Sequence, residues 1–233
     1  ITSLKYDTIN TMNIHPFFVT FFELLLVLTF FVFPSFSSKP QSFISFSYMT
    51  ITIVYSFLSA LCIIALHKKQ IFFAYILSKR TFSLKKIPAV FFAFVLLTAA
   101  SFLFSLFAQG EVFITLERAS GPHHYAILLL WIFCLSFFEE SLYRFYLPDT
   151  LLQLLIFFPA INNKATHHLF YYGIPILLFS LAHSYNGIYG ILFAAVSCIF
   201  FFMLKKKYNS LLLNSIVHCA YNVFSLYLMQ KSI

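Results

Sequence analysis

Long apolar stretches separated by short polar segments run through the whole sequence. A membrane-spanning helix needs about 20 mainly apolar residues. Seven stretches come close to this length: roughly 16–36, 43–66, 87–108, 125–158, 168–185, 187–204 and 208–230. A further stretch, 71–84, is shorter and flanked by bases, which is typical of an interfacial helix or a half-span. The pattern predicts an all-α fold, a polytopic transmembrane helical bundle of about 7–8 spans.

The composition supports a membrane protein and argues against a soluble one. The chain is 61% hydrophobic and 9% charged, with a mean hydropathy of +0.89, whereas soluble domains are about 25% charged. Phe and Tyr are abundant, but no basic soluble module accompanies them, so we expect no nucleic-acid partner. Membrane lipid is the first expected partner, and 1–233 is expected to form a single integral membrane domain.

Basic residues in the predicted loops indicate the orientation of the chain. Lys and Arg accumulate in cytoplasmic loops. With seven spans, three bases fall on one side, Lys39, Arg118 and Lys231, and eleven on the other: Lys5, Lys68, Lys69, Lys79, Arg80, Lys85, Lys86, Lys164, Lys205, Lys206 and Lys207. The amino terminus is therefore expected on the cytoplasmic side of the membrane. We expect that membrane to be a bacterial plasma membrane. A lipid-headgroup patch is the other interpretation of the three consecutive lysines.

Two adjacent glutamates stand in the apolar stretch 125–158, which Pro148 is expected to interrupt. A charge at the centre of a membrane helix costs at least about 2.5–3.5 kcal/mol and marks a functional site by default. Glu140 and Arg144 are four residues apart, so on a helix they share a face and can pair. Glu139 points to another face and stays available as a general base. A purely structural ion pair would explain Glu140 and Arg144 but not Glu139.

Two later spans carry polar residues at helical spacing. Phe179 and His183 are four residues apart, as are His218 and Asn222. Alone, His183 could be an interfacial cap, and the other pair a cross-link between helices. Three polar groups in three spans instead predict a shared cavity, in which carboxylate and imidazole could activate water while imidazole and amide N–H groups stabilise an oxyanion. This model places Glu139 nearer the cytoplasmic face and His183 nearer the outer face.

The order of these motifs resembles a known family. Glu-Glu-x-x-x-Arg at 139–144, Phe-x-x-x-His at 179–183 and His-x-x-x-Asn at 218–222 are similar to the CPBP intramembrane proteases, the CAAX-processing and bacteriocin-processing (Abi) endopeptidases. The resemblance covers about 137–224, whereas 1–125 matches only as hydrophobic spans. Tyr143-Arg144-Phe145 departs from the Phe-Arg-Gly of many members. The resemblance implies the CAAX prenyl endopeptidase fold, with a catalytic core at 125–230 and additional transmembrane helices at 1–124.

The resemblance also implies roles for individual residues. Glu139 and His183 would activate water, with Glu140 and Arg144 supporting the first glutamate. His218 and Asn222 would form the oxyanion hole. The substrate would be a peptide or protein at the membrane, and the reaction peptide-bond hydrolysis.

The sequence leaves alternatives open for both the cofactor and the function. We favour a glutamic mechanism with no cofactor or metal, although Glu139, His183 and His218 could equally be zinc ligands with an open position. A non-catalytic protein of the same fold, acting as a bacteriocin-immunity factor or scaffold, is the alternative to a protease. A proton-coupled transporter that uses the same Glu and His residues is a third hypothesis.

Overall fold

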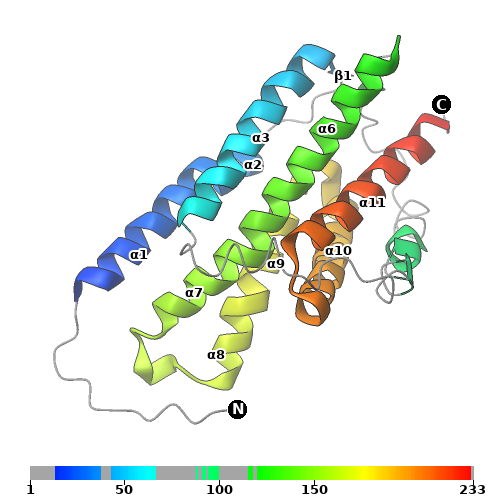
Figure 1. Ribbon diagram of the computed structural model, residues 1–233. Coiled ribbons are helices and arrows are strands. Elements are labelled where there is room, and N and C mark those ends of the chain that lie inside the picture. Colours follow the sequence, from blue (N-terminus) through cyan, green and yellow to red (C-terminus); the bar gives the residue numbers. More distant parts are fainter. Residues whose placement is uncertain are drawn as a thin grey trace.

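The described residues of the computed structural model form an all-α helical bundle (Figure 1). These residues are 14–37, 43–66, 88, 91–92, 94–99, 115–117 and 120–231. The expected segment 71–84 and most of the expected span 87–108 lie outside them. Among the described residues, three helices are long and apolar enough to cross a membrane, Phe46–Leu66, Pro122–Leu155 and Ser184–Tyr208, and two shorter apolar helices are Pro16–Val32 and Leu211–Leu226. The count of 7–8 spans stays a prediction.

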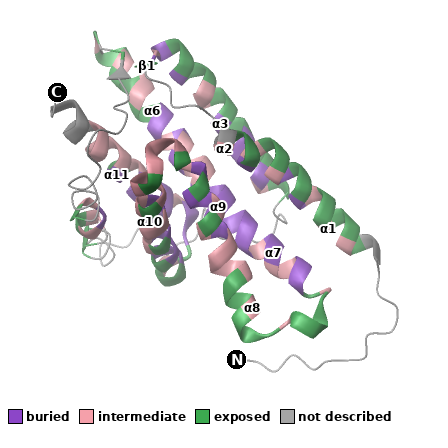
Figure 2. Cartoon of the chain, turned by 180° about the vertical axis from the view of Figure 1, so that it is seen from behind, coloured by how far each residue is buried: buried purple, intermediate pink, exposed green. Residues whose placement is uncertain are grey.

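The amino-terminal part contains two long helical segments. The first comprises α1 (Ile14–Val27), a π-helical segment (Leu28–Val32) and α2 (Phe33–Ser37). The second is α3 (Phe46–Leu66). Many of their large apolar side chains are exposed, as the green outer faces of α1 and α3 show in Figure 2. Apolar side chains that face outward along whole helices fit a lipid surface rather than water.

A short parallel pair of strands, one just before α3 and one after it in the chain, was not predicted from the sequence. β1 (Phe43–Ile44) pairs with β2 (Thr115–Leu116), with Phe43 opposite Thr115. Glu117 follows β2 and accepts a hydrogen bond from the backbone N–H of Phe46 at 2.6 Å. A carboxylate at this position satisfies one of the free N–H groups at the start of α3 and is favoured by the helix dipole.

The carboxy-terminal half carries the remaining helices. The main ones are α6 (Pro122–Glu139), continued by a π-helical segment (Glu140–Tyr146) and α7 (Leu147–Leu155); α8 (Lys164–His168), continued by a π-helical segment (Leu169–Gly173) and α9 (Ile174–Ala182); α10 (Gly187–Tyr208); and α11 (Leu211–Lys231). Helix α6 lies between α3 and α11, α9 packs against α10, and α1 packs against α7 (Figure 1).

Each π-helical segment of the described chain ends two residues before a proline. The residues that directly precede Pro34, Pro148 and Pro175 donate their N–H to the carbonyl five positions back, in Leu28, Leu142 and Leu169. Proline has no N–H, and its ring clashes with the carbonyl four residues earlier. Widening the helix by one residue relieves that clash, and neighbouring side chains can satisfy the released carbonyl.

The helix therefore continues through Pro148, contrary to the interruption predicted from the sequence. Pro122–Leu155 is one helical run of 34 residues, and Glu139 is the last of the 18 residues of α6. The glutamates thus lie near the middle of this run rather than near one end. Glu139 lies beside His218, with its Oε2 3.5 Å from Nε2, whereas the depth of His183 relative to Glu139 stays a prediction.

Candidate active site

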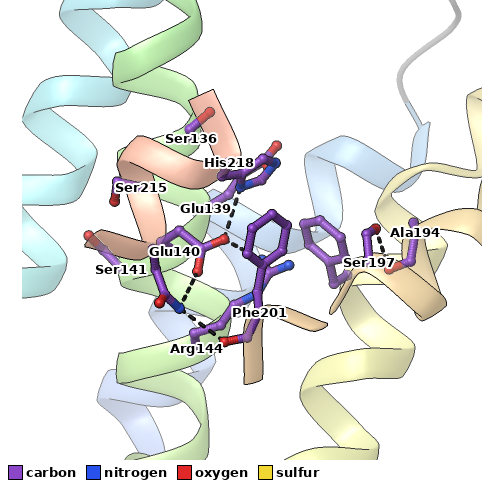
Figure 3. Close-up of polar contacts among 12 residues, drawn as sticks. Ser136, Glu139, Glu140, Ser141, Arg144, Ala194, Ser197, Phe201, Ser215 and His218 are labelled. Carbon is purple, nitrogen blue, oxygen red and sulfur yellow. Dashed lines mark hydrogen bonds and ion pairs between the residues drawn. The ribbon is translucent and has the colours of Figure 1, made fainter. Parts of the chain in front are cut away.

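Glu140 is the centre of a buried polar network (Figure 3). Its side chain is fully buried. His218 Nδ1–H donates to its Oε1 at 2.9 Å, and Asn214 Nδ2–H donates to its Oε2 at 3.2 Å. Arg144 Nη1 lies 3.6 Å from Oε1, so the ion pair expected from the spacing is present. Residues from α6–α7 and α11 thereby hold one carboxylate from three directions.

Glu139 is the freer of the two carboxylates. Its side chain is 24% exposed, and its Oε2 lies 3.5 Å from His218 Nε2, which is too long for a hydrogen bond. His218 therefore stands between the glutamates, with Nδ1 on Glu140 and Nε2 facing Glu139. Glu140 is thus fully engaged by neighbouring side chains, whereas Glu139 is partly exposed. A catalytic role for Glu139 stays a prediction.

Arg144 is held by charge and aromatic rings rather than by side-chain hydrogen bonds. Its guanidinium is fully buried, and its three nitrogens have no hydrogen-bond partner among the described residues. The guanidinium carbon lies 3.9 Å from the ring centroid of Phe179 and 5.2 Å from that of Phe201. Cation–π contacts are strongest when both groups are desolvated. Phe179 of the second motif therefore covers the cation of the first.

His183 lies at the end of α9, where the chain turns into α10. Its Nδ1–H donates to the carbonyl of Phe179 at 2.8 Å, which places a proton on Nδ1 and leaves Nε2 without a hydrogen-bond partner among the described residues. The turn needs two glycines. Gly187 has φ 69°, and a side chain at Gly190 would collide with Asn186 and lie 3.2 Å from the carbonyl oxygen of His183. The Gly-x-x-Gly sequence after His183 thus has a steric reason.

The structure places all the predicted site residues near one another, but not all of them are in direct contact with the glutamates. The Phe179 ring centroid lies 4.5 Å from that of His183 and 6.5 Å from that of His218, so one ring joins the two histidine motifs. Asn222 Nδ2–H donates to Ser136 Oγ at 3.3 Å, one turn before Glu140. Within the described chain, neither His183 nor Asn222 is hydrogen-bonded to Glu139 or Glu140.

Two residues of the network were missed from the sequence. Asn214 bridges Glu140 and the Phe201 carbonyl, which it reaches at 3.0 Å. Its position four residues before His218 extends the same helical face, so the spacing rule could have found it. Lys205 was assigned to a cytoplasmic loop, but it lies in the last turn of α10, is 4% exposed and donates to the Arg144 carbonyl at 2.5 Å. No sequence signal links residues so far apart.

The contact between Lys205 and Arg144 is a consequence of Pro148. In a regular α-helix, the N–H of residue 148 would bond to the carbonyl of Arg144, and proline removes that donor. Lys205 supplies another from α10. This cross-link fixes the π-helical segment that carries Glu140 and Arg144, and π-helical turns are frequent at functional sites.

The sequence left zinc binding by Glu139, His183 and His218 open, and the metal-free mechanism stays a prediction. In the described parts of the chain, no three His, Cys, Asp or Glu side chains are grouped so that they could hold one metal ion. Glu139 and His218 are close enough to bind one metal ion together, but among the described residues His183 does not join them as a third ligand. No chemical step is therefore assigned to a metal here.

An all-α bundle with apolar outer faces and a buried carboxylate–histidine network at mid-helix defines an integral membrane protein with an intramembrane polar site. Residues 121–224 match the family model of the type II CAAX prenyl endopeptidase Rce1-like proteins. The resemblance to the CPBP family is thereby confirmed for this segment, which contains all six predicted site residues. No curated protein and no solved structure matched the chain.

Proposed function

We propose that this protein is an intramembrane endopeptidase that hydrolyses a peptide bond of a membrane-associated protein or peptide. The observation that carries the proposal is the division of labour between adjacent glutamates. Glu140 is buried and held by three partners, whereas Glu139 is partly exposed beside the same histidine. A structural ion pair needs only the first of these. The similarity of 121–224 to type II CAAX prenyl endopeptidases supports a protease.

Hydrolysis would begin with a water molecule held by Glu139 and His183. Glu139 accepts a proton while the water oxygen bonds to the carbonyl carbon of the substrate. His183, whose Nδ1–H is bonded to Phe179, orients the water through Nε2. The tetrahedral intermediate then collapses, the C–N bond breaks, and the proton held by Glu139 passes to the leaving amine. Atoms and charge balance without a cofactor.

His218 and Asn222 would stabilise the negative oxygen of the intermediate. A protonated imidazole donates from both nitrogens, so Nε2–H could serve the oxyanion while Nδ1–H remains on Glu140. The amide of Asn222, held here by Ser136, would supply a second donor. Preorganised donors of this kind lower the barrier most in a site that excludes water. Glu140, Arg144 and Asn214 act as positioning residues for His218.

The proposal includes the organisation and location of the protein. Residues 125–230 would form the catalytic core and 1–124 additional transmembrane helices. The protein would lie in a bacterial plasma membrane with its amino terminus in the cytoplasm, in agreement with the bias of Lys and Arg along the sequence. Secreted peptide precursors or bacteriocins are candidate substrates.

Cleavage by purified protein tests the function directly. The full chain in detergent would be incubated with membrane-associated candidate peptides, with and without a chelator, and the products identified by mass spectrometry. We expect a defined product that chelation does not remove and that Glu139→Gln eliminates. A product formed equally by Glu139→Gln would contradict the mechanism. Loss of activity on chelation, with recovery on adding zinc, would overturn the assignment of a metal-free reaction.

A further inference from the structure

A cavity of about 310 Å³ lies between α10 and the π-helical segment that precedes Pro175. Its lining residues are Tyr171, Tyr172, Phe202, Lys205, Lys206 and Asn209. Pockets that bind small ligands in proteins have volumes of about 300 Å³ or more. The cavity therefore has room for more than a few waters. None of its lining residues belongs to the predicted glutamate and histidine motifs.

The polar part of the cavity is cationic. Lys205 is 4% exposed, and its ammonium group has three N–H donors. Among the described residues it makes one hydrogen bond, to the Arg144 carbonyl, while the nearest Asp149 oxygen is 4.0 Å away. Lys206, the second cation, is exposed. Lys205 and Lys206 both line the cavity, and Asp149 is the one described carboxylate at ion-pair distance from Lys205. The site therefore carries a net positive charge.

The apolar part of the cavity is aromatic. The ammonium of Lys205 lies 5.0 Å from the ring centroid of Tyr171, and Phe202 packs against the Tyr172 ring with centroids 5.2 Å apart. Tyrosines of this kind are enriched where a protein meets the membrane–water interface. A ligand that combines a negative group with apolar chains would match both parts.

The cavity lies at the carboxy-terminal end of α10. Helix α10 has 22 residues, which extend roughly 33 Å, close to the thickness of about 30 Å of the hydrocarbon core. Lys205 and Lys206 belong to its last turn. When α10 crosses the membrane, this turn reaches the plane in which lipid phosphates lie.

We propose that this cavity binds the phosphate group of an anionic phospholipid. The phosphate oxygens accept hydrogen bonds from Lys205 and Lys206, and the glycerol and first methylene groups lie against the aromatic rings. Inorganic phosphate has the same anionic chemistry but nothing to place on those rings. Because Lys205 also bonds to the Arg144 carbonyl, the bound headgroup contacts a side chain that fixes the turn carrying Glu140.

The test compares two neighbouring lysines. Full-length protein would be placed in phosphatidylcholine nanodiscs with increasing phosphatidylglycerol, and thermal unfolding would be followed by the fluorescence of Trp131. Retained lipids would be counted by native mass spectrometry. Lys206→Gln should lower the apparent affinity for phosphatidylglycerol about fivefold. This is the size expected for one lysine charge near an anionic surface. Lys207→Gln is the matched control, since Lys207 is exposed and adjacent but does not line the cavity.

Two results would overturn the proposal. Equal dependence on phosphatidylglycerol in Lys206→Gln and Lys207→Gln, whether unchanged from wild type or weakened alike, would mean diffuse attraction to the surface or no role for Lys206. Stabilisation by inorganic phosphate in pure phosphatidylcholine nanodiscs, equal to that by phosphatidylglycerol, would mean a site for a soluble anion. A saturable effect of phosphatidylglycerol that is weakened in Lys206→Gln and unchanged in Lys207→Gln would support it.

Discussion

Two proline-associated π-helical segments of this molecule have the same local cause and different surroundings. Before Pro34, the released carbonyl of Phe30 accepts a hydrogen bond from Tyr55 Oη at 3.1 Å, on an exposed face. Before Pro148, the released carbonyl of Arg144 accepts one from the buried Lys205 at 2.5 Å. Both partners come from another helix.

The difference lies in what each segment carries. Leu28–Val32 contains no charged residue, whereas Glu140–Tyr146 contains Glu140 and Arg144 and is buried throughout. A neutral hydroxyl is sufficient for the first. The second needs a cation that also touches Asp149 and two rings. Proline thus determines that the helix widens, and the neighbouring helices determine whether the widened turn becomes a site.

The largest expected effect is on catalysis. It distinguishes Glu139, directly before the segment Glu140–Tyr146, from Glu23, in the helix that leads into Leu28–Val32. Glu139→Gln should lower peptide hydrolysis by up to about 10⁴-fold, because an amide cannot accept the proton of water. Glu23→Gln is the matched control: Glu23 lies in α1 and accepts from Tyr146 Oη at 3.0 Å, a contact that an amide oxygen can keep. Product formation would be measured by mass spectrometry. Equal losses in both variants would remove Glu139 from the chemistry.

His218→Ala and Asn222→Ala should each reduce turnover about 10²–10³-fold, the usual loss for one oxyanion donor. The measurement is the rate at saturating peptide, together with the thermal unfolding temperature. Ser136→Ala is the control, since it removes only the group that Asn222 contacts. A loss in Asn222→Ala that Ser136→Ala reproduces would assign Asn222 to packing instead.

Removing the cation of the charged segment should affect folding as well as activity. Arg144→Ala leaves Glu140 buried without its ion pair, and stranding a buried charge costs about 3–5 kcal/mol. Folded yield by size-exclusion chromatography and the unfolding temperature in detergent would show it. Arg144→Lys keeps the charge and should retain part of both. Unchanged yield and activity in Arg144→Ala would contradict the pairing.

Lys205→Met tests the cross-link at Pro148. It leaves the Arg144 carbonyl without its donor, at a cost of about 1–3 kcal/mol for a buried polar group. Thermal unfolding measures the stability, and peptide cleavage reports on the turn that carries Glu140. Asp149→Asn separates loss of the hydrogen bond from loss of the ion pair. A stability equal to wild type would show that the carbonyl finds another donor.

The smallest expected effect is on stability and concerns the π-helical segment before Pro34. Tyr55→Phe removes the donor to the Phe30 carbonyl and should cost about 0.6 kcal/mol, the average for a hydrogen bond between membrane helices. Activity should not change. If Tyr55→Phe destabilised the protein as much as Lys205→Met, the two proline-associated segments would depend equally on their hydrogen-bond donors.

Much of the fold and site could be predicted from the sequence because membrane helices leave strong patterns. Apolar length gave the helices that include Phe46–Leu66 and Gly187–Tyr208, and the spacing of four gave the contact between Glu140 and Arg144. The interruption at Pro148 was wrong, because a proline in a membrane helix can be accommodated by a wider turn. The pairing of 43–44 with 115–116 has no local signal at all.

By itself, the sequence determined which residues carry charge into an apolar bundle and which of them share a helical face, because periodicity is a local property of the chain. Only the tertiary structure decided that His218 stands between Glu139 and Glu140, that Phe179 covers Arg144, and that Lys205 replaces the N–H missing at Pro148. These contacts join helices far apart in sequence. They form because a charge or a free carbonyl inside the bundle must find its partner on a neighbouring helix.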